Sequence, residues 1–196
     1  MKTLLITIFS IATLSSLQAQ DFNKQLSTAR TAYSGKKLEE ARFAMQQMLQ
    51  ELDIMAGKDI LKMLPAKMDA LNANAAHDNV SGASGFAGII IHRDYGAGEK
   101  MAEVDIIGNS PMLSSINALL ALPFIANNAN QKVIKLEGYK ALLNINKDSE
   151  TSKVTYEIQL PLNSSLITLK APNATEDEIK KFASTIPVGQ LAKTLQ

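Results

Sequence analysis

The chain of 196 residues contains no cysteine. This absence excludes disulfide bonds, thiol redox chemistry, cysteine nucleophiles and zinc sites built from thiolates. The fold must therefore be held together by burial of apolar surface, which a chain of this length can supply on its own. A sequence without cysteine also offers no attachment point for the lipid of a bacterial lipoprotein.

Residues 1–19 have the pattern of a cleaved secretion signal. Lys2 is the only charged residue, a mainly apolar run from residue 4 to residue 17 follows, and Ala19 provides a small residue at the cleavage point. We expect cleavage after Ala19, although Leu17 is less suitable than alanine at its position and allows a shift by one residue. The apolar run falls short of the roughly 20 residues that span a bilayer. We therefore expect an exported protein, periplasmic or secreted, with no transmembrane span in the mature chain.

Neither sign of charge is in excess. The chain has 20 Lys and Arg against 19 Asp and Glu, and removal of Lys2 with the signal leaves 19 basic residues against 19 acidic ones. A net charge near zero argues against binding of nucleic acid and against electrostatic attachment to anionic membranes. We expect no nucleic-acid partner.

Residues 20–64 have the composition of helices, with abundant Ala, Leu, Met, Gln, Lys and Glu and no proline. Ser34-Gly35 is expected to end a first helix, with Gly35 as its C-terminal cap. A second helix carries an apolar stripe of Leu38, Ala41, Met45, Met48, Leu49, Leu52 and Met55. The region is predicted to form an antiparallel helical hairpin.

The junction of that hairpin, residues 32–41, resembles the helix-turn-helix junction of a single tetratricopeptide repeat. Repeats of this type need about three copies to bury a continuous core, and the sequence holds no second copy. A hairpin that packs on its own domain is therefore the favoured interpretation.

Residues 65–85 are expected to be a linker or long loop. Pro65 ends the helical region, and residues 72–85 are rich in Asn, Ala, Ser and Gly, which favour turns over regular elements. The boundary between the hairpin and the following domain, residues 86–196, is placed in this segment.

From residue 86 apolar residues recur at every second position, as in the strands of a half-buried antiparallel sheet. Strands are predicted at residues 86–93, 101–107, 132–137, 139–146, 154–160 and 166–170. One helix is expected from Ser110-Pro111 to about residue 123 and another from the capping box at Thr175 to Glu178. The predicted fold class is α+β, an N-terminal helical hairpin followed by an antiparallel sheet of about six strands covered by helices.

The order of elements over residues 84–195 resembles the PsbP-like α/β/α sandwich, an antiparallel sheet with helices on both faces. The resemblance rests on element order and includes no diagnostic motif. PsbP-like domains are typically non-enzymatic exported proteins that assist a membrane complex. The resemblance therefore implies a binding role, although function follows fold only loosely.

No catalytic or metal-binding motif is recognised in the sequence. His77 and His92, the only histidines, are separated by a spacing that fits neither a helical zinc site nor a zinc ribbon, so we expect no metal and no cofactor. Glu103 and Asp105 share one strand face, as the carboxylates of a glycosidase could, but a strand face turned to water gives the same alternation. A small periplasmic hydrolase with an unrecognised site is the alternative that this pair leaves open.

Two groups of residues are candidate binding surfaces. His92, Arg93 and Tyr95 lie at a strand end beside a glycine-rich turn, where they could bind an anion or a loop of a partner. Residues 106–131 carry no charge, and Leu119 and Leu122 within them form either core or an apolar binding surface, depending on their exposure.

Together these patterns predict an exported, non-enzymatic protein of the bacterial envelope that binds a protein partner or an apolar ligand. A self-associating structural protein is a further alternative, because methionine-rich helical stripes serve partners as well as cores. The sequence leaves a homo-oligomer open.

Overall fold

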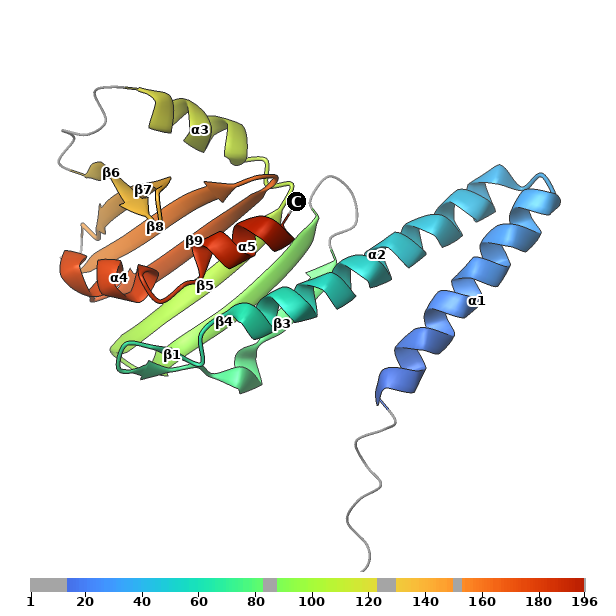
Figure 1. The fold of residues 1–196 in the computed structure, drawn as a ribbon, viewed down its shortest axis with the longest axis horizontal. Coiled ribbons are helices and arrows are strands. Elements are labelled where there is room, and N and C mark those ends of the chain that lie inside the picture. Colours follow the sequence, from blue (N-terminus) through green and yellow to red (C-terminus); the bar gives the residue numbers. More distant parts are fainter. Residues whose placement is uncertain (1–13, 83–87, 123–129, 150–152, 196) are drawn as a thin grey trace, which may run out of the picture. The chain divides into compact units, whose positions relative to one another are not determined.

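The structure is a computed structural model that describes residues 14–82, 88–122, 130–149 and 153–195 (Figure 1). The chain divides into two compact units, residues 1–53 and 54–196, and the division falls inside a helix. Residues 1–13 of the predicted secretion signal, 83–85 of the predicted loop and 123–129 of the charge-free segment lie outside the described residues.

The first unit is a helical hairpin made of α1 (Leu14–Ser34) and the beginning of α2 (Leu38–Met63). The amide of Lys36 donates to the carbonyl of Tyr33, and the amide of Lys37 donates to that of Ala32, which is the hydrogen-bond pair of a Schellman turn. The residue in the left-handed conformation is Lys36, with φ of 58°. The sequence predicts Gly35 for this role, but the amide of Gly35 is still bonded to Thr31 in the last helical turn.

The second unit is built on a seven-stranded antiparallel sheet, and the predicted α+β class is confirmed. The strands are β3 (Asn79–Gly82), β4 (Ile89–Ala97), β5 (Lys100–Gly108), β6 (Gln131–Leu136), β7 (Tyr139–Lys147), β8 (Val154–Leu162) and β9 (Ser165–Pro172). Their order across the sheet is β3-β4-β5-β9-β8-β7-β6. Glu137 and Gly138 between β6 and β7 both have positive φ, as a two-residue type I′ hairpin requires.

Residues 65–82, predicted as a linker or long loop, instead contain short regular elements. They form the strand pair β1 (Lys67–Met68) and β2 (Leu71–Asn72), the 3₁₀ turn η1 (Ala75–His77) and edge strand β3. The physical reason is burial, because Met68 is completely inaccessible and Leu71 nearly so, and both belong to the main core. Two isolated apolar residues in a polar segment are enough to fix its position.

One face of the sheet, here called the core face, carries the main hydrophobic cluster. A row of buried side chains crosses four neighbouring strands in register: Ile91, Ile106, Ile167 and Leu160. Residues 54–63 of α2, helix α4 (Glu176–Ala183) and helix α5 (Val188–Thr194) contribute buried side chains to the same cluster. The core face is therefore covered by helices.

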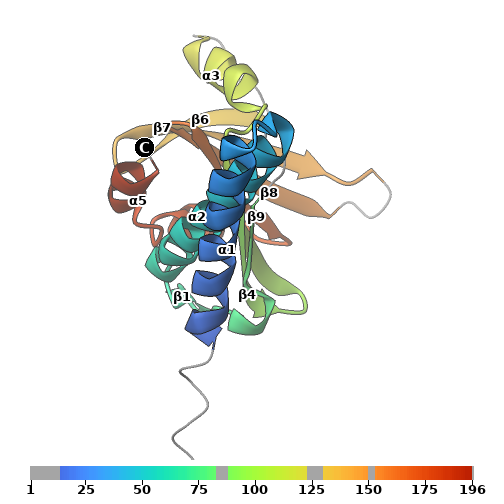
Figure 2. The same ribbon diagram turned by 90° about the vertical axis from the view of Figure 1, so that its right-hand side faces the viewer.

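In the described part of the chain, helix α3 (Leu113–Ala121) covers part of the opposite face, here called the α3 face. Ile116 and Leu120 of α3 pack with Leu142 and Leu166 of the sheet in a second, smaller cluster. Because these strand residues alternate with those of the main cluster, α3 lies on the other side of the sheet from α4 and α5, and both views show it set apart from α5 (Figure 1, Figure 2).

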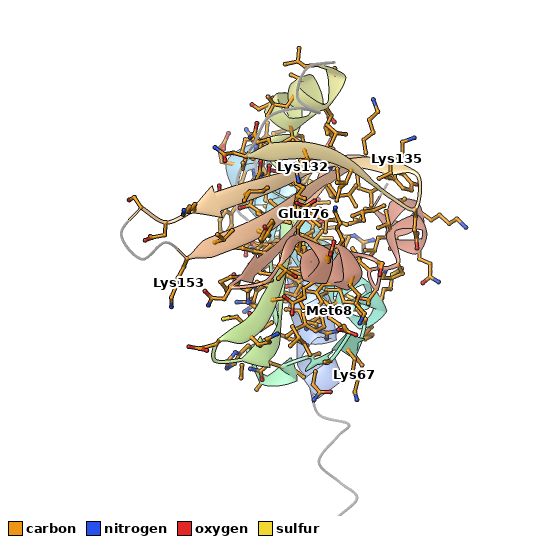
Figure 3. All side chains as sticks on the ribbon, turned by 90° about the vertical axis from the view of Figure 1, so that its left-hand side faces the viewer. Lys67, Met68, Lys132, Lys135, Lys153 and Glu176 are labelled. Atoms are coloured by element: carbon orange, nitrogen blue, oxygen red, sulfur yellow. The ribbon has the colours of Figure 1, made fainter. Side chains whose placement is uncertain are left out.

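Lys132 of edge strand β6 connects the sheet to α4. Its ammonium lies 2.6 Å from one oxygen of Glu176, and the ammonium of Lys180 lies 2.6 Å from the other. Figure 3 shows Lys132 on its strand next to Glu176. The hydrogen bonds from Lys132 and Lys180 lower the pKa of the Glu176 carboxyl, which stays ionised at the start of α4, where a negative charge is favoured.

Thr175→Ala should lower the free energy of unfolding of the second unit by about 1 kcal/mol. The Thr175 hydroxyl accepts a hydrogen bond from the Glu178 amide at 3.2 Å, and the Glu178 carboxylate accepts one from the Thr175 amide at 2.8 Å. Urea unfolding followed by circular dichroism measures the loss. Ser184→Ala, which removes an exposed hydroxyl bonded to the Lys181 carbonyl, is the control and should cost less than about 0.5 kcal/mol. Equal losses would contradict the capping role.

Candidate functional site

The candidate residues on β4 do not share one surface. Successive side chains of a strand point to opposite faces of the sheet, so His92 and Asp94 lie on the α3 face, while Arg93 and Tyr95 lie on the core face with Ile91. The predicted cluster of His92, Arg93 and Tyr95 is therefore split between the two faces.

Tyr95 is a core residue. Its side chain is completely buried, and its hydroxyl donates to the carbonyl oxygen of Pro65 at 3.0 Å. Burial raises the pKa of Tyr95 to about 12, so the phenol stays neutral and keeps its proton for this bond. Tyr95 thereby fixes the segment that follows α2 to the C-terminal part of β4.

Arg93 forms a partly buried ion pair with Asp78, which precedes β3. Its Nε and Nη2 donate to the two carboxylate oxygens at 2.8 and 2.6 Å, and its Nη1 donates to the Leu64 carbonyl at 3.1 Å. The side chains are only 12% and 16% exposed. The Asp78 hydrogen bond raises the pKa of the guanidinium despite its burial. With all three guanidinium nitrogens engaged inside the unit, Arg93 is held in a structural position.

His92 is the centre of a polar network on the α3 face. Its Nδ1 lies 2.7 Å from Asp105 on β5, and its Nε2 lies 2.9 Å from Asp94 on its own strand. The second Asp94 oxygen lies 2.8 Å from Nδ1 of His77 in η1. Both histidines of the chain therefore belong to one hydrogen-bonded series, His77–Asp94–His92–Asp105, which the sequence analysis did not recognise.

The network favours a charged His92. Burial lowers the pKa of His92, but the hydrogen bond and charge of Asp105, together with those of Asp94, outweigh burial, and the pKa lies above its ordinary value of 6.5. Only an imidazolium can donate from both ring nitrogens at once, as the two carboxylates require. The ring therefore acts as a clamp between β4 and β5.

This geometry does not suit general-base catalysis. A catalytic histidine directs one nitrogen to an orienting carboxylate and leaves the other for the reacting proton, whereas both nitrogens of His92 face carboxylates. Glu103 lies on the same face as Asp105, as predicted, and stands opposite Lys170 in the register. Among the described residues, no group of three or more His, Asp or Glu side chains is arranged to hold a metal ion.

The two leucines predicted as core or surface are intermediate and exposed, respectively. Leu119 is half-buried beside the smaller cluster, while Leu122, directly after α3, is 54% exposed. Met112, directly before α3, is exposed to a similar extent. The two ends of α3 therefore present large apolar side chains to solvent.

Two hollows can be outlined among the described residues. One of about 10 Å³ lies beside Lys100, Glu178 and Phe182 and has room for about one water molecule. The other is an open groove of about 400 Å³ in the helical hairpin, lined mainly by hydroxyl and charged residues, such as Thr31 and Glu40. Neither resembles the mainly apolar, well-enclosed pockets that bind small ligands.

No protein-family model and no curated protein matches the chain. Within the part of the chain that the structure describes, no helix combines the length and the apolar character needed to cross a membrane.

His92→Gln should remove part of the pH dependence of stability. Because the folded-state pKa of His92 is raised, its stabilising contribution is complete below the unfolded-state pKa and is lost as pH rises through the folded-state pKa. The wild-type chain should therefore lose more free energy of unfolding than the variant between about pH 6 and about pH 9. Urea titrations at both values test this, and parallel pH profiles for the two proteins would contradict the clamp.

Proposed function

We propose that this chain is an exported, non-enzymatic protein of the bacterial envelope that binds a protein partner through the outer surface of α3. The observation that carries the proposal is the absence of charge from that exposed surface. It consists of Met112, Ser114, Ser115, Asn117, Ala118, Ala121 and Leu122.

Such a surface is unusual for a helix that faces water. Solvent-facing surfaces commonly have about 25–35% charged residues, whereas the centres of protein interfaces are depleted in charge and enriched in methionine. The small side chains between Met112 and Leu122 would let a partner approach the helix closely, and the two large apolar side chains would anchor it at either end. The combination is what makes the surface unusual. An uncharged helix surface without exposed large apolar side chains such as Met112 and Leu122 would be ordinary.

A protein partner accounts for these features better than an apolar ligand. A ligand of that kind is normally enclosed in a concave apolar pocket of about 300–1,000 Å³. The outlined hollows are either too small or lined by polar residues, and neither lies against α3. An extended helix surface suits a macromolecule.

Two further observations support a non-enzymatic role. Both nitrogens of His92 face carboxylates, so His92 has no ring nitrogen left to act as a general base. The order of elements over residues 84–195 resembles PsbP-like domains, and helices on both faces of an antiparallel sheet agree with that resemblance. We propose a PsbP-like role, assistance of a larger assembly, on this basis.

Leu122→Glu should weaken capture of the partner at least about tenfold, because a charge buried at an interface is costly. The measurement is a quantitative pull-down from the envelope fraction with the tagged mature chain. Tyr139→Glu, at an exposed large apolar residue elsewhere in the same unit, is the matched control and should bind like wild type. A photo-crosslinking residue at Met112 should label the same protein.

Equal capture by Leu122→Glu and wild type would contradict the α3 surface. If an apolar compound co-purifies with wild type and not with Leu122→Glu, the α3 surface binds an apolar ligand and not a protein partner.

The exported protein should begin at Gln20, one residue after the predicted cleavage point. Mass spectrometry of the N-terminal peptide from periplasmic and culture fractions tests this. Ala19→Arg should block cleavage and leave the precursor in the cell, while Ala19→Gly should be processed. An uncleaved chain that starts at Met1 in those fractions would contradict cleavage, and recovery of the chain from the cytoplasmic fraction alone would contradict export.

A further inference from the structure

The first unit buries small side chains and exposes large ones. Among residues 22–53, whose side chains the structure describes, the buried apolar residues are alanines on both helices: Ala29, Ala32, Ala41 and Ala44. The exposed large residues on one side of α2 are Leu38, Met45, Leu49 and Leu52, with 48–63% of each accessible. This distribution reverses the usual preference, in which leucine and methionine are among the most buried residues.

These four residues form one continuous line, here called the α2 stripe. Their spacings of seven, four and three residues place them on one face of a helix, at alternating positions of a heptad repeat. At 1.5 Å per residue the stripe is about 21 Å long. Phe43 is equally exposed but points to a different side of α2, because its position does not fit the repeat.

Two opposite charges border the stripe. Arg42 lies four residues after Leu38 and three before Met45, and Asp53 lies four residues after Leu49. Both side chains are exposed, and among the described residues neither forms an ion pair. A partner helix on the stripe would have to match a cation at one end and an anion at the other.

A second copy of α2 provides that match when it runs antiparallel. With Met45 of one copy beside Leu49 of the other, Arg42 comes within about one residue of the height of Asp53 of the second copy, since 42 + 53 and 45 + 49 differ by one. The arrangement is reciprocal, so two Arg–Asp pairs form around a two-fold axis. A parallel arrangement would place Arg42 beside Arg42 and Asp53 beside Asp53.

We propose that the α2 stripe is a homodimer interface in which α2 of two copies pack antiparallel, with an Arg42–Asp53 pair at each end of the seam. The proposal concerns the first unit and does not depend on the partner proposed for α3. It covers Met45 and Leu49 with each other across the seam and gives both bordering charges a partner.

Charge swapping tests the proposal on the mature chain by sedimentation velocity over a range of concentrations. Wild type should be a dimer that dissociates on dilution. Arg42→Asp and Asp53→Arg should each weaken dimerisation by about tenfold or more, since each turns two attractive pairs into repulsive ones. The double variant restores opposite charges and should dimerise within about threefold of wild type.

Apolar substitutions provide the second arm. Met45→Glu with Leu49→Glu should give a monomer, while Phe43→Glu should remain dimeric. All of these positions are exposed, so circular dichroism and urea midpoints should match wild type and separate loss of the dimer from loss of the fold. A monomeric wild type at all concentrations overturns the proposal. So does a double charge variant that stays as weak as the single ones.

The absence of native cysteine makes the helix orientation measurable. In an oxidised mixture of Met45→Cys and Leu49→Cys chains, the antiparallel seam should give mainly the mixed disulfide between the two chains. A parallel seam would give mainly disulfides between identical chains, and that result would overturn the proposed geometry.

Discussion

The pairing of β5 with β9 is the constraint on which the second unit depends. β3, β4 and β5 follow one another along the chain as antiparallel neighbours, and so do β6 to β9; the β5–β9 contact alone joins the two groups in the sheet. Its pairs, such as Ile106 with Ile167, are distant in sequence and costly to form in chain entropy. Burial of the row that runs from Ile91 to Leu160 offsets that cost.

The same pairing determines where α3 lies. Because β5 is central and β6 is an edge strand, the segment between them has to pass the intervening strands, and α3 contacts β7 and β8 on its way. One short helix covers only part of that face. Among the described residues, the His92 network occupies another part of that face, and the outer side of α3 is exposed to solvent. Strand order therefore determines where the candidate surface on α3 lies. Its lack of charge is determined by the residues of α3 and not by the fold.

Period-two alternation predicted the strands because one face of each is buried, and helix caps such as Thr175 were local enough to recognise. The elements within residues 65–82 were missed because β1 and β2 are held by burial of Met68 and Leu71 against distant parts of the chain. The His92–Asp105 contact could have been predicted from the sequence, because counting back from the hairpin pair Ala97–Lys100 gives the pair His92–Asp105.

The position of His77 could not have been predicted in this way, because it depends on the path of η1. Alternation along β4 also separates Arg93 and Tyr95 from His92, a consequence that the grouping of these three residues overlooked.

The two exposed apolar surfaces differ in how they can achieve specificity. The α3 surface is uncharged, so shape, the positions of Met112 and Leu122, and hydrogen bonds to its serines and Asn117 have to distinguish one partner from another. The α2 stripe carries Arg42 and Asp53 at its border, and a parallel alignment in register brings like charges together. Apolar burial supplies attraction in both cases, but only the stripe has charges that oppose the alternatives. This difference favours a fixed, symmetric contact for α2 and a contact determined by the partner's shape for α3.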